Sequence, residues 1–171
     1  MHQKEQEEFN KNFIEAAKKG DLPLVQSLLS KGANIHANND LALIESFENR
    51  NIEVVKYLIE QGADIHIYDD YSLRWASEYG YLDIVQYSIE NGANIHARDD
   101  DSLKSSSLNN QLEVVNYFLF DCKMKIKKKT KDWLVKNNQH QTLGLIEKRD
   151  LLWKLNKNLK KNDSVDKKMK I

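Results

Sequence analysis

The amino-acid sequence predicts an all-α solenoid of about five stacked helix-turn-helix pairs. The first observation behind this prediction is a repeat. Residues 52–70 (IEVVKYLIEQGADIHIYDD) return thirty positions later as residues 82–100 (LDIVQYSIENGANIHARDD), and ten of the nineteen aligned positions are identical without a gap. The second observation is a set of glycines at the same spacing, Gly32, Gly62 and Gly92. Self-similarity at a fixed period of this size is typical of stacked repeat arrays.

The second helix of each pair is the more clearly marked one. In residues 52–61 the apolar side chains cover most of the helix circumference, so we expect neighbours to pack on more than one side of this helix. The glycine that follows supplies the left-handed residue with which helices commonly end. Equivalent helices are expected at residues 22–30, 112–120 and 143–147, and in the copy that starts at Leu82.

The first helix of each pair follows a polar connector that ends in an acid. Asp40, Asp70 and Asp100 each lie three residues before a leucine, so each is predicted to cap the N-terminus of the helix that follows. The first helices are then short. They are expected at residues 41–49, 71–79 and 101–109, with an earlier one around Phe13 and a later one around Trp133.

The thirty-residue register continues beyond the clear copies. Cys122 stands where a helix-ending glycine is expected, and Thr130 stands where Asp100 would recur. The helix that begins near Thr142 is expected to run longer than a repeat helix and to lie across the open end of the stack as a cap. The chain is thus divided into a repeat stack (1–122), a basic connector with capping helices (123–161) and a lysine-rich, disordered tail (162–171).

Two substitutions weaken the pattern in the third and fourth units. Ser88 occupies the place of Leu58, and residues 103–107 read LKSSS where the third unit reads LRWAS. Losing apolar volume at stacked positions weakens the packing locally. The junction of these units is therefore predicted to be the soft spot of the array, and Ser88→Leu is predicted to stabilise it.

Charge is distributed unevenly, although the formal net charge is zero. Residues 1–121 carry 10 Lys/Arg and 21 Asp/Glu, whereas residues 122–171 carry 16 and 5. The acidic, polar N-terminus does not resemble a secretory signal, and no apolar run approaches the roughly 18 residues of a spanning helix. One cysteine alone cannot form an intrachain disulfide. We therefore expect a monomeric, soluble, intracellular protein without membrane association, in the cytoplasm or, alternatively, the nucleus.

The repeated segment resembles the ankyrin repeat. The resemblance is carried by residues 53–55 and 62–65 (EVV and GADI) and by residues 83–85 and 92–95 (DIV and GANI), and it extends over about residues 10–122. It implies an elongated, curved stack that binds protein partners. The usual ankyrin period is about 33 residues, so a period of thirty implies shortened hairpin fingers. This shorter form, rich in Asn, Lys and Ile, is similar to ankyrin proteins of amoeba-infecting giant DNA viruses.

Three histidines recur with the repeat and invite a metal-site interpretation. Stacked helices lie roughly 8–10 Å apart, whereas zinc ligand atoms lie about 2 Å from the metal, so His36, His66 and His96 cannot share one ion. We expect them instead to form local hydrogen bonds in turns. Cys122 has no nearby histidine in the sequence to activate it, and no phosphate-binding glycine loop is present. The sequence predicts no enzyme, with no catalytic residue, metal or cofactor.

The expected function is protein–protein binding as a scaffold or adaptor, through the edge formed by the connectors and first helices. Acidic and aromatic side chains on this edge are predicted to bind a protein with a basic surface, with Asp69 and Asp99 as the freer acids. The candidate residues are Asn39, Asp40, Glu48, Asn49, Tyr68, Asp69, Asp70, Tyr71, Glu78, Tyr79, Asp99, Asp100 and Asp101.

An alternative function is nucleic-acid binding or nuclear targeting through residues 123–131 (KMKIKKKTK). This run contains no arginine and no aromatic side chain to stack on bases, which disfavours nucleic acid as the partner. A solvated connector between the fourth and fifth pairs is the simpler interpretation.

Overall fold

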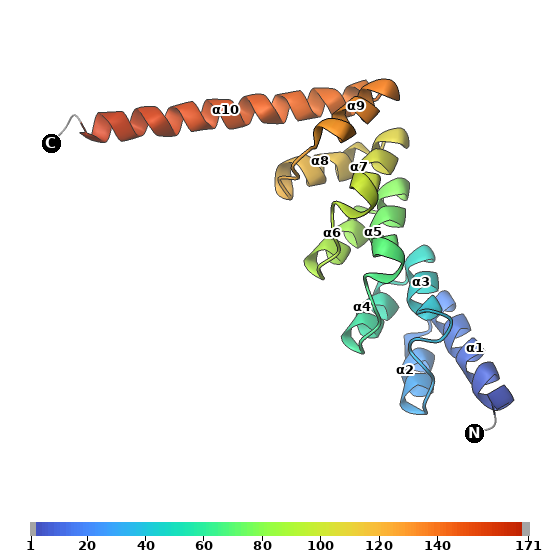
Figure 1. The fold of residues 1–171 in the computed structure, drawn as a ribbon. Helices are drawn as coiled ribbons and strands as arrows, with labels where there is room; N and C mark the ends of the chain where they lie inside the picture. Colours follow the sequence, from blue (N-terminus) through green and yellow to red (C-terminus); the bar gives the residue numbers. More distant parts are fainter. Residues whose placement is uncertain (1–2, 169–171) are drawn as a thin grey trace.

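The computed structural model describes residues 3–168, with side chains described up to residue 159. Within that part of the chain every regular element is helical and no strand is present, which confirms the predicted all-α solenoid. Five helix pairs follow one another (Figure 1). The first helices are α1 (Gln3–Lys19), α3 (Leu41–Glu48), α5 (Ile67–Tyr79), α7 (Ala97–Leu108) and α9 (Lys128–Lys136). The second helices are α2 (Leu22–Ser30), α4 (Ile52–Glu60), α6 (Leu82–Glu90), α8 (Leu112–Asn116), which continues as the π-helical segment η1 (Tyr117–Asp121), and α10 (His140–Lys168).

The pairs stack into an elongated array, from α1 and α2 at one end to α9 at the other, and α10 extends away from that end (Figure 1). Each first helix packs against the next along one side, α1 on α3, α3 on α5, α5 on α7 and α7 on α9. The segments between units are turns, so the shortened hairpin fingers of the prediction contain no strand in the described residues. None of the described helices is long and apolar enough to span a bilayer.

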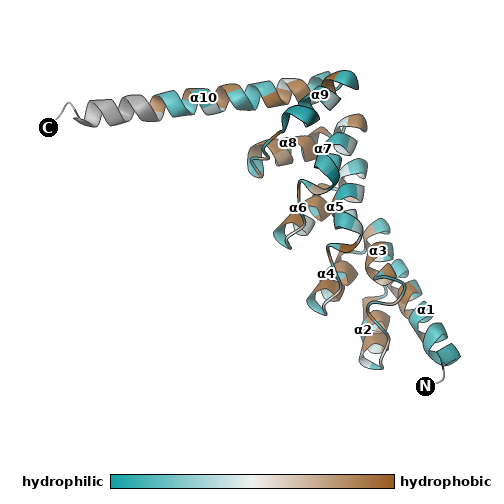
Figure 2. Ribbon diagram, in the orientation of Figure 1, coloured by the Kyte–Doolittle hydropathy of each residue, from teal (hydrophilic) through white to brown (hydrophobic). Residues whose placement is uncertain are grey.

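The core is built from columns of residues that recur every thirty positions, and Figure 2 shows hydrophobic residues concentrated on helices such as α2 and α4. Each column places one buried side chain per unit. The first-helix column is Phe13, Leu43, Leu73 and Leu103, and the second-helix column is Val25, Val55, Val85 and Val115, all at most 1% exposed. Burying such a side chain stabilises by about 1.5–3 kcal/mol. Stability therefore comes from contacts between neighbouring units.

Glycines end the regular second helices, as predicted. Gly62 and Gly92 have φ of 99° and 95°, and the N–H of Ala63 closes the turn on the carbonyl of Leu58 at 2.9 Å. A β-carbon at Gly62 would meet no atom within 4 Å. The requirement for glycine here is therefore one of backbone conformation rather than of space.

The prediction that connector acids cap the first helices is wrong. Asp40, Asp70 and Asp100 have φ of 52°, 57° and 65°, whereas a capping residue needs β-region backbone. Asp40 precedes α3 without a capping hydrogen bond from its side chain. At the start of α2, by contrast, Asp21 does cap a helix, because its side chain accepts a hydrogen bond from the N–H of Leu24 at 3.1 Å.

The fourth unit ends its second helix differently. In η1 the closing hydrogen bond runs from the N–H of Met124 to the carbonyl of Phe118 at 2.9 Å, one residue longer than the bond from Ala63 to Leu58. The left-handed residue is therefore Lys123, with φ of 52°. Cys122 has φ of −76°, so the prediction that it substitutes for the helix-ending glycine is wrong.

The last helix also differs from the expected cap. Thr142 and Ile146 are each 1% exposed and pack α10 onto the stack, but the rest of the helix continues away from it (Figure 1). The backbone of residues 162–168 is helical where disorder is predicted. Residues 169–171 of that predicted tail lie outside the described residues.

Candidate functional site

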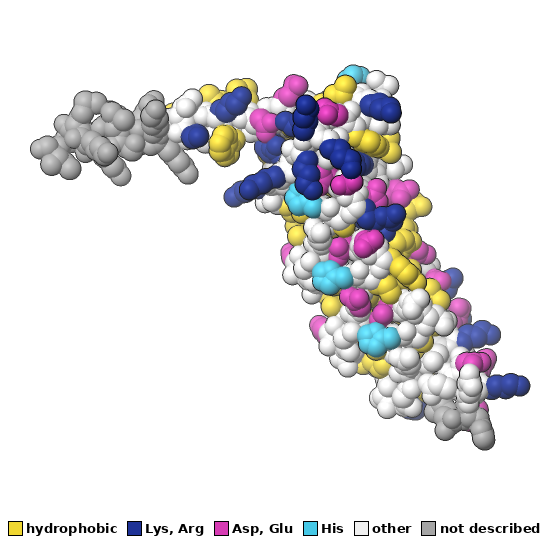
Figure 3. Space-filling view, viewed as in Figure 1, with side chains coloured by type: hydrophobic (Ala, Val, Ile, Leu, Met, Phe, Trp, Pro, Cys, Tyr) yellow, Lys and Arg dark blue, Asp and Glu magenta, His cyan; other side chains and the backbone are white. Residues whose placement is uncertain are grey.

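The connectors form a ladder of hydrogen bonds in which the repeating histidines take part. The N–H of His66 donates to Asp64 Oδ1 at 2.9 Å, and its Nδ1 lies 2.7 Å from Asp70 Oδ1. Equivalent distances are 2.9 Å for His36 with Asp40 and 2.5 Å for His96 with Asp100. The predicted local role of the histidines is confirmed. Figure 3 shows histidine side chains in a row along this face, and no group in the described residues could hold a metal ion.

Three of the predicted binding residues lie inside the array. Asp40, Asp70 and Asp100 are only 5%, 5% and 0% exposed, because their carboxylates accept hydrogen bonds within the stack. Asp40 Oδ1 accepts from the N–H of Asp64 in the next unit at 3.3 Å, and Asp100 accepts from the hydroxyl of Thr130. Their placement on the binding edge is corrected here, and the surface proposed below leaves them out.

The two acids expected to be free differ from one another. Asp99 forms an ion pair with Lys129 at 2.5 Å, and the hydrogen bond from that lysine lowers the pKa of Asp99. The expectation that Asp99 is free is therefore wrong. Asp69 is exposed, and its backbone carbonyl accepts a hydrogen bond from Arg74 Nε at 3.1 Å.

A groove crosses the first helices of the second, third and fourth units. It encloses about 730 Å³ and combines carboxylates with aromatic rings, and we call it the acid–aromatic groove. It is lined by Glu48, Tyr71, Arg74, Trp75, Glu78, Tyr79, Tyr81, Asp101 and Ser105. Five of these residues belong to the predicted set, and the groove thus brings part of that set together.

Three aromatic rings form the centre of this groove. The centroids of Trp75 and Tyr79 lie 5.0 Å apart, those of Trp75 and Tyr81 5.2 Å, and those of Tyr79 and Tyr81 6.0 Å. Tyr79 is 52% exposed, whereas the guanidinium of Arg50 covers the Tyr81 ring at 4.4 Å. The sequence prediction missed Trp75 and Tyr81. A helical spacing of four between Trp75 and Tyr79 is the signal that identifies one shared face.

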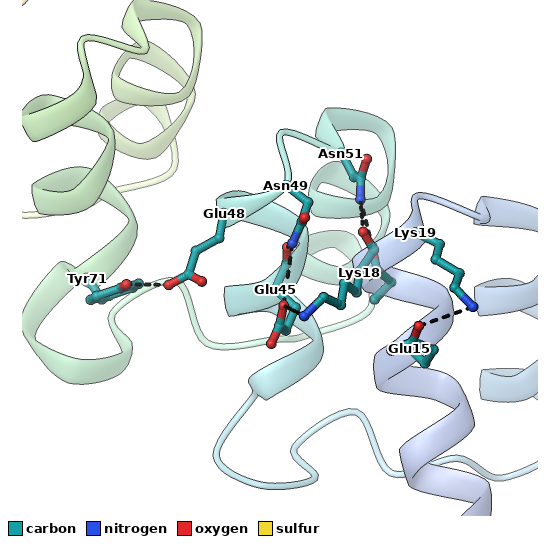
Figure 4. Close-up of polar contacts among 9 residues, drawn as sticks. Glu15, Lys18, Lys19, Glu45, Glu48, Asn49, Asn51 and Tyr71 are labelled. Carbon is teal, nitrogen blue, oxygen red and sulfur yellow. Dashed lines mark hydrogen bonds and ion pairs between the residues drawn. The ribbon is translucent and has the colours of Figure 1, made fainter.

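The polar groups of the groove are held across unit boundaries. The hydroxyl of Tyr71 on α5 donates to Glu48 on α3, as Figure 4 shows. Burial, with Glu48 next, raises the pKa of Tyr71 well above its ordinary range, so the phenol keeps its proton. Arg74 pairs with Asp101 at 3.2 Å. The exposed Glu78 has no ion pair within the described residues and is available to a partner.

The remaining predicted residues lie beside the groove. Tyr68 is 54% exposed, and its hydroxyl accepts a hydrogen bond from Asn39 Nδ2 at 3.1 Å. Asn49 turns back onto its own helix, where its Nδ2 donates to the carbonyl of Glu45 at 2.8 Å (Figure 4). Neither Asn39 nor Asn49 lines the acid–aromatic groove.

Comparison with known protein families gives one match. A family model described as ankyrin repeats (3 copies) matches residues 13–99, just over half of the 171 residues. The chain belongs to the ankyrin-repeat family. The match covers the units that carry most of the acid–aromatic groove, while the helix pairs of this ankyrin-repeat array continue to α9 and α10. No curated protein sequence matches the chain.

Family membership gives the general role of the array. Ankyrin repeats are protein–protein interaction modules and are generally not enzymes. The structure adds one observation on reactivity. Burial raises the pKa of the Cys122 thiol, which keeps it protonated rather than activating it as a thiolate.

Proposed function

We propose that this ankyrin-repeat protein is a non-catalytic scaffold or adaptor whose acid–aromatic groove binds a basic segment of a partner protein. The observation that carries the proposal is the half-exposed ring of Tyr79, packed on Trp75 and flanked by Glu78. Aromatic side chains at the centre of a concave surface are the usual anchors of interfaces. Carboxylates beside them attract a cationic partner.

The groove accommodates a cationic side chain in two ways at once. A lysine or arginine lying over Tyr79 gains a cation–π contact, as the intramolecular contact of Arg50 with Tyr81 illustrates. The same cation lies within reach of Glu78, whose carboxylate has no ion pair among the described residues. Asp69, exposed on the adjacent connector, extends the negative surface along the array.

The test uses a labelled twelve-residue peptide of alternating Lys and Ser, with fluorescence anisotropy as the readout. Tyr79→Ala should weaken binding by roughly tenfold, and Glu78→Lys should do the same. Tyr68→Ala is the matched control, since Tyr68 is equally exposed but lies outside the groove. A peptide with Glu in place of Lys should not bind. Equal losses for Tyr79→Ala and Tyr68→Ala would contradict the proposal.

The basic segment 123–131 is the second candidate. Two of its six lysines are already engaged, Lys129 with Asp99 and Lys131 with Asp150 at 3.2 Å. The others are exposed, which favours an anionic partner. Nucleic-acid binding through this segment would weaken steeply with salt, and a salt titration with a labelled oligonucleotide tests it.

The cellular setting is also a proposal. We propose a monomer in the cytoplasm, with nuclear import as the alternative. The thirty-residue period and the Asn, Lys and Ile content, similar to giant-virus ankyrin proteins, make a host-cell protein our proposed partner. A partner captured through the groove and lost with Tyr79→Ala would identify it.

A further inference from the structure

The part of α10 where the helix leaves the stack, which we call its root, presents a second, separate surface. Beyond its buried first turns this helix leaves the stack (Figure 1) and exposes one apolar side chain after another. These residues are each 43–64% exposed, and they are Leu151, Leu152, Trp153, Leu155 and Leu159. An exposed apolar cluster of this kind marks an interaction site more often than chance.

Part of this cluster lines a hollow between α10 and the π-helical turn. The hollow measures about 570 Å³, and we call it the α10 root groove. It is lined by Leu119, Phe120, Lys123, Met124, Lys125, Arg149, Asp150, Leu152, Trp153 and Asn156. Leu119 and Met124 are 0% and 2% exposed, whereas Trp153 is 64% exposed. The groove therefore has a buried apolar floor and an exposed aromatic wall.

Hydrogen bonds hold the two walls of the groove in place. The guanidinium of Arg149 donates to the carbonyl of Met124 at 2.6 Å and to Asp150 at 2.7 Å. Lys131 on α9 reaches the same carboxylate at 3.2 Å. The direction in which α10 leaves the stack is thus tied to the residues of the π-helical turn, and the groove is preformed.

The charge at the rim is positive. Hydrogen bonds from Arg149, supported by Lys131, keep the pKa of Asp150 below its ordinary value, so this carboxylate is already compensated. Lys123 and Lys125 are exposed and pair with no carboxylate in the part of the chain whose side chains are described. An apolar floor below a cationic rim complements a ligand that is apolar at its centre and acidic at its edges.

We propose that the α10 root groove binds an acidic amphipathic segment of a protein partner. One bulky apolar side chain enters between Trp153 and Phe120, and flanking carboxylates meet Lys123 and Lys125. The floor favours a protein segment over a membrane, because a flat bilayer can touch Leu155 or Leu159 but cannot reach the buried floor. This site is independent of the acid–aromatic groove and has the opposite charge preference.

The test uses the full chain and a labelled, fourteen-residue synthetic peptide with Leu at helical spacing and Glu elsewhere. Fluorescence anisotropy at low salt should show saturable binding. Trp153→Ala should weaken it by about tenfold. Val135→Ala is the matched control, since Val135 is 60% exposed on α9 outside the groove, and it should leave binding unchanged.

The charge preference is tested separately. Lys125→Glu should weaken binding of the Leu–Glu peptide, whereas Lys136→Glu, an exposed lysine at the end of α9, should not. A matched Leu–Lys peptide, measured in the Tyr79→Ala, Glu78→Lys background so that the acid–aromatic groove does not bind it, should bind at least tenfold more weakly than the Leu–Glu peptide. Circular dichroism confirms that each variant keeps its helix content, and Leu152→Ala repeats the test at a second wall residue.

Three results would overturn the proposal. The first is equal binding of the Leu–Lys and Leu–Glu peptides in the background that lacks the acid–aromatic groove. The second is binding of phosphatidylserine vesicles that Leu155→Ala weakens while the Leu–Glu peptide does not bind. The third is self-association in analytical ultracentrifugation that Trp153→Ala abolishes, since a second copy would then occupy the groove. Loss of binding at the acid–aromatic groove leaves the proposal untouched, because that groove is tested with the Lys–Ser peptide.

Discussion

The third and fourth units end their second helices in two different ways. In the third unit the closing hydrogen bond of α6 runs from the N–H of Ala93 to the backbone carbonyl of Ser88, and Gly92 takes the left-handed position. In the fourth unit η1 inserts one extra residue before Met124 closes on Phe118, and Lys123 is left-handed. The hydroxyl of Thr130 nevertheless donates a hydrogen bond to Asp100, thirty residues earlier. The connector that follows η1 is therefore one residue shorter.

This difference shows which part of the repeat is constrained. The core column keeps its spacing into both second helices, because Val85 and Val115, which precede the two helix ends, are equally buried. The helix end, by contrast, accepts an insertion when the next connector compensates for it. Packing between units, rather than the form of any one turn, sets the thirty-residue spacing.

The largest effect is expected where the two units differ in core volume. Phe118 is fully buried at the position of Ser88, and Phe118→Ala should reduce the free energy of unfolding by about 3–5 kcal/mol. Urea unfolding followed by circular dichroism measures this loss. A loss smaller than that of Leu58→Ala, at the same register position, would show that η1 does not depend on its aromatic residue.

The next effect concerns Ser88, for which the structure reverses the prediction made from sequence. Its buried hydroxyl donates to Ser72 at 3.4 Å, so leucine would enter a small polar site. Ser88→Leu should therefore destabilise by about 1–3 kcal/mol. Removing both hydroxyls in the double variant Ser72→Ala, Ser88→Ala should reduce the free energy of unfolding by less than Ser88→Leu does. A higher Tm for Ser88→Leu would restore the simpler view of an underfilled core.

The helix ends give a pair of opposite predictions. Gly62→Val should cost about 1–2 kcal/mol, because its left-handed backbone penalises a branched side chain. Lys123→Gly should stabilise by up to about 1 kcal/mol for the same reason. Gly144 is helical and has no atom within 4 Å of a built β-carbon, so Gly144→Ala should not destabilise. Equal losses at Gly62 and Gly144 would contradict this assignment.

The smallest effect is the contribution of Tyr117, in the fourth unit, to the loss of stability at high pH. Burial, with neighbouring Cys122 next, raises the pKa of Tyr117 to about 12. In the unfolded chain tyrosine titrates near about 10, so the unfolded state loses its proton first and stability falls as pH rises from about 10 to 12. Tyr117→Phe should reduce this fall, measured as the urea midpoint at pH 9 and pH 11. An unchanged fall would exclude Tyr117 as its source.

Repetition made most of the fold predictable. The core columns and the helix-ending glycines follow from residues that recur every thirty positions, and each needs only its own unit and an equivalent neighbour. The η1 insertion lies in a segment that packs on α10 of the next unit, and no recurring residue marks it. The roles of Asp40 and Asp100 depend on partners 24 and 30 residues away. No local pattern contains such information.

The candidate site was predictable only in part, for a related reason. Acids and tyrosines on the first helices mark the side of the array on which the acid–aromatic groove lies. Which acids are free depends on distant lysines, as Asp99 and Lys129 show. The ring cluster joins Trp75 on α5 to Tyr81 in the following turn. Gly80 interrupts the aromatic residues at that point, so the sequence does not predict this contact.

One hydrogen bond between successive units recurs with the thirty-residue repeat. Asn10 accepts from the N–H of Asn34 at 2.9 Å, and Asp40 does the same for Asp64 one unit later. The first and second units therefore each offer an acceptor to the unit that follows. A block of thirty residues duplicated between the first and second units would find both partners already in place, so such an array can lengthen in whole steps during evolution while both grooves stay intact.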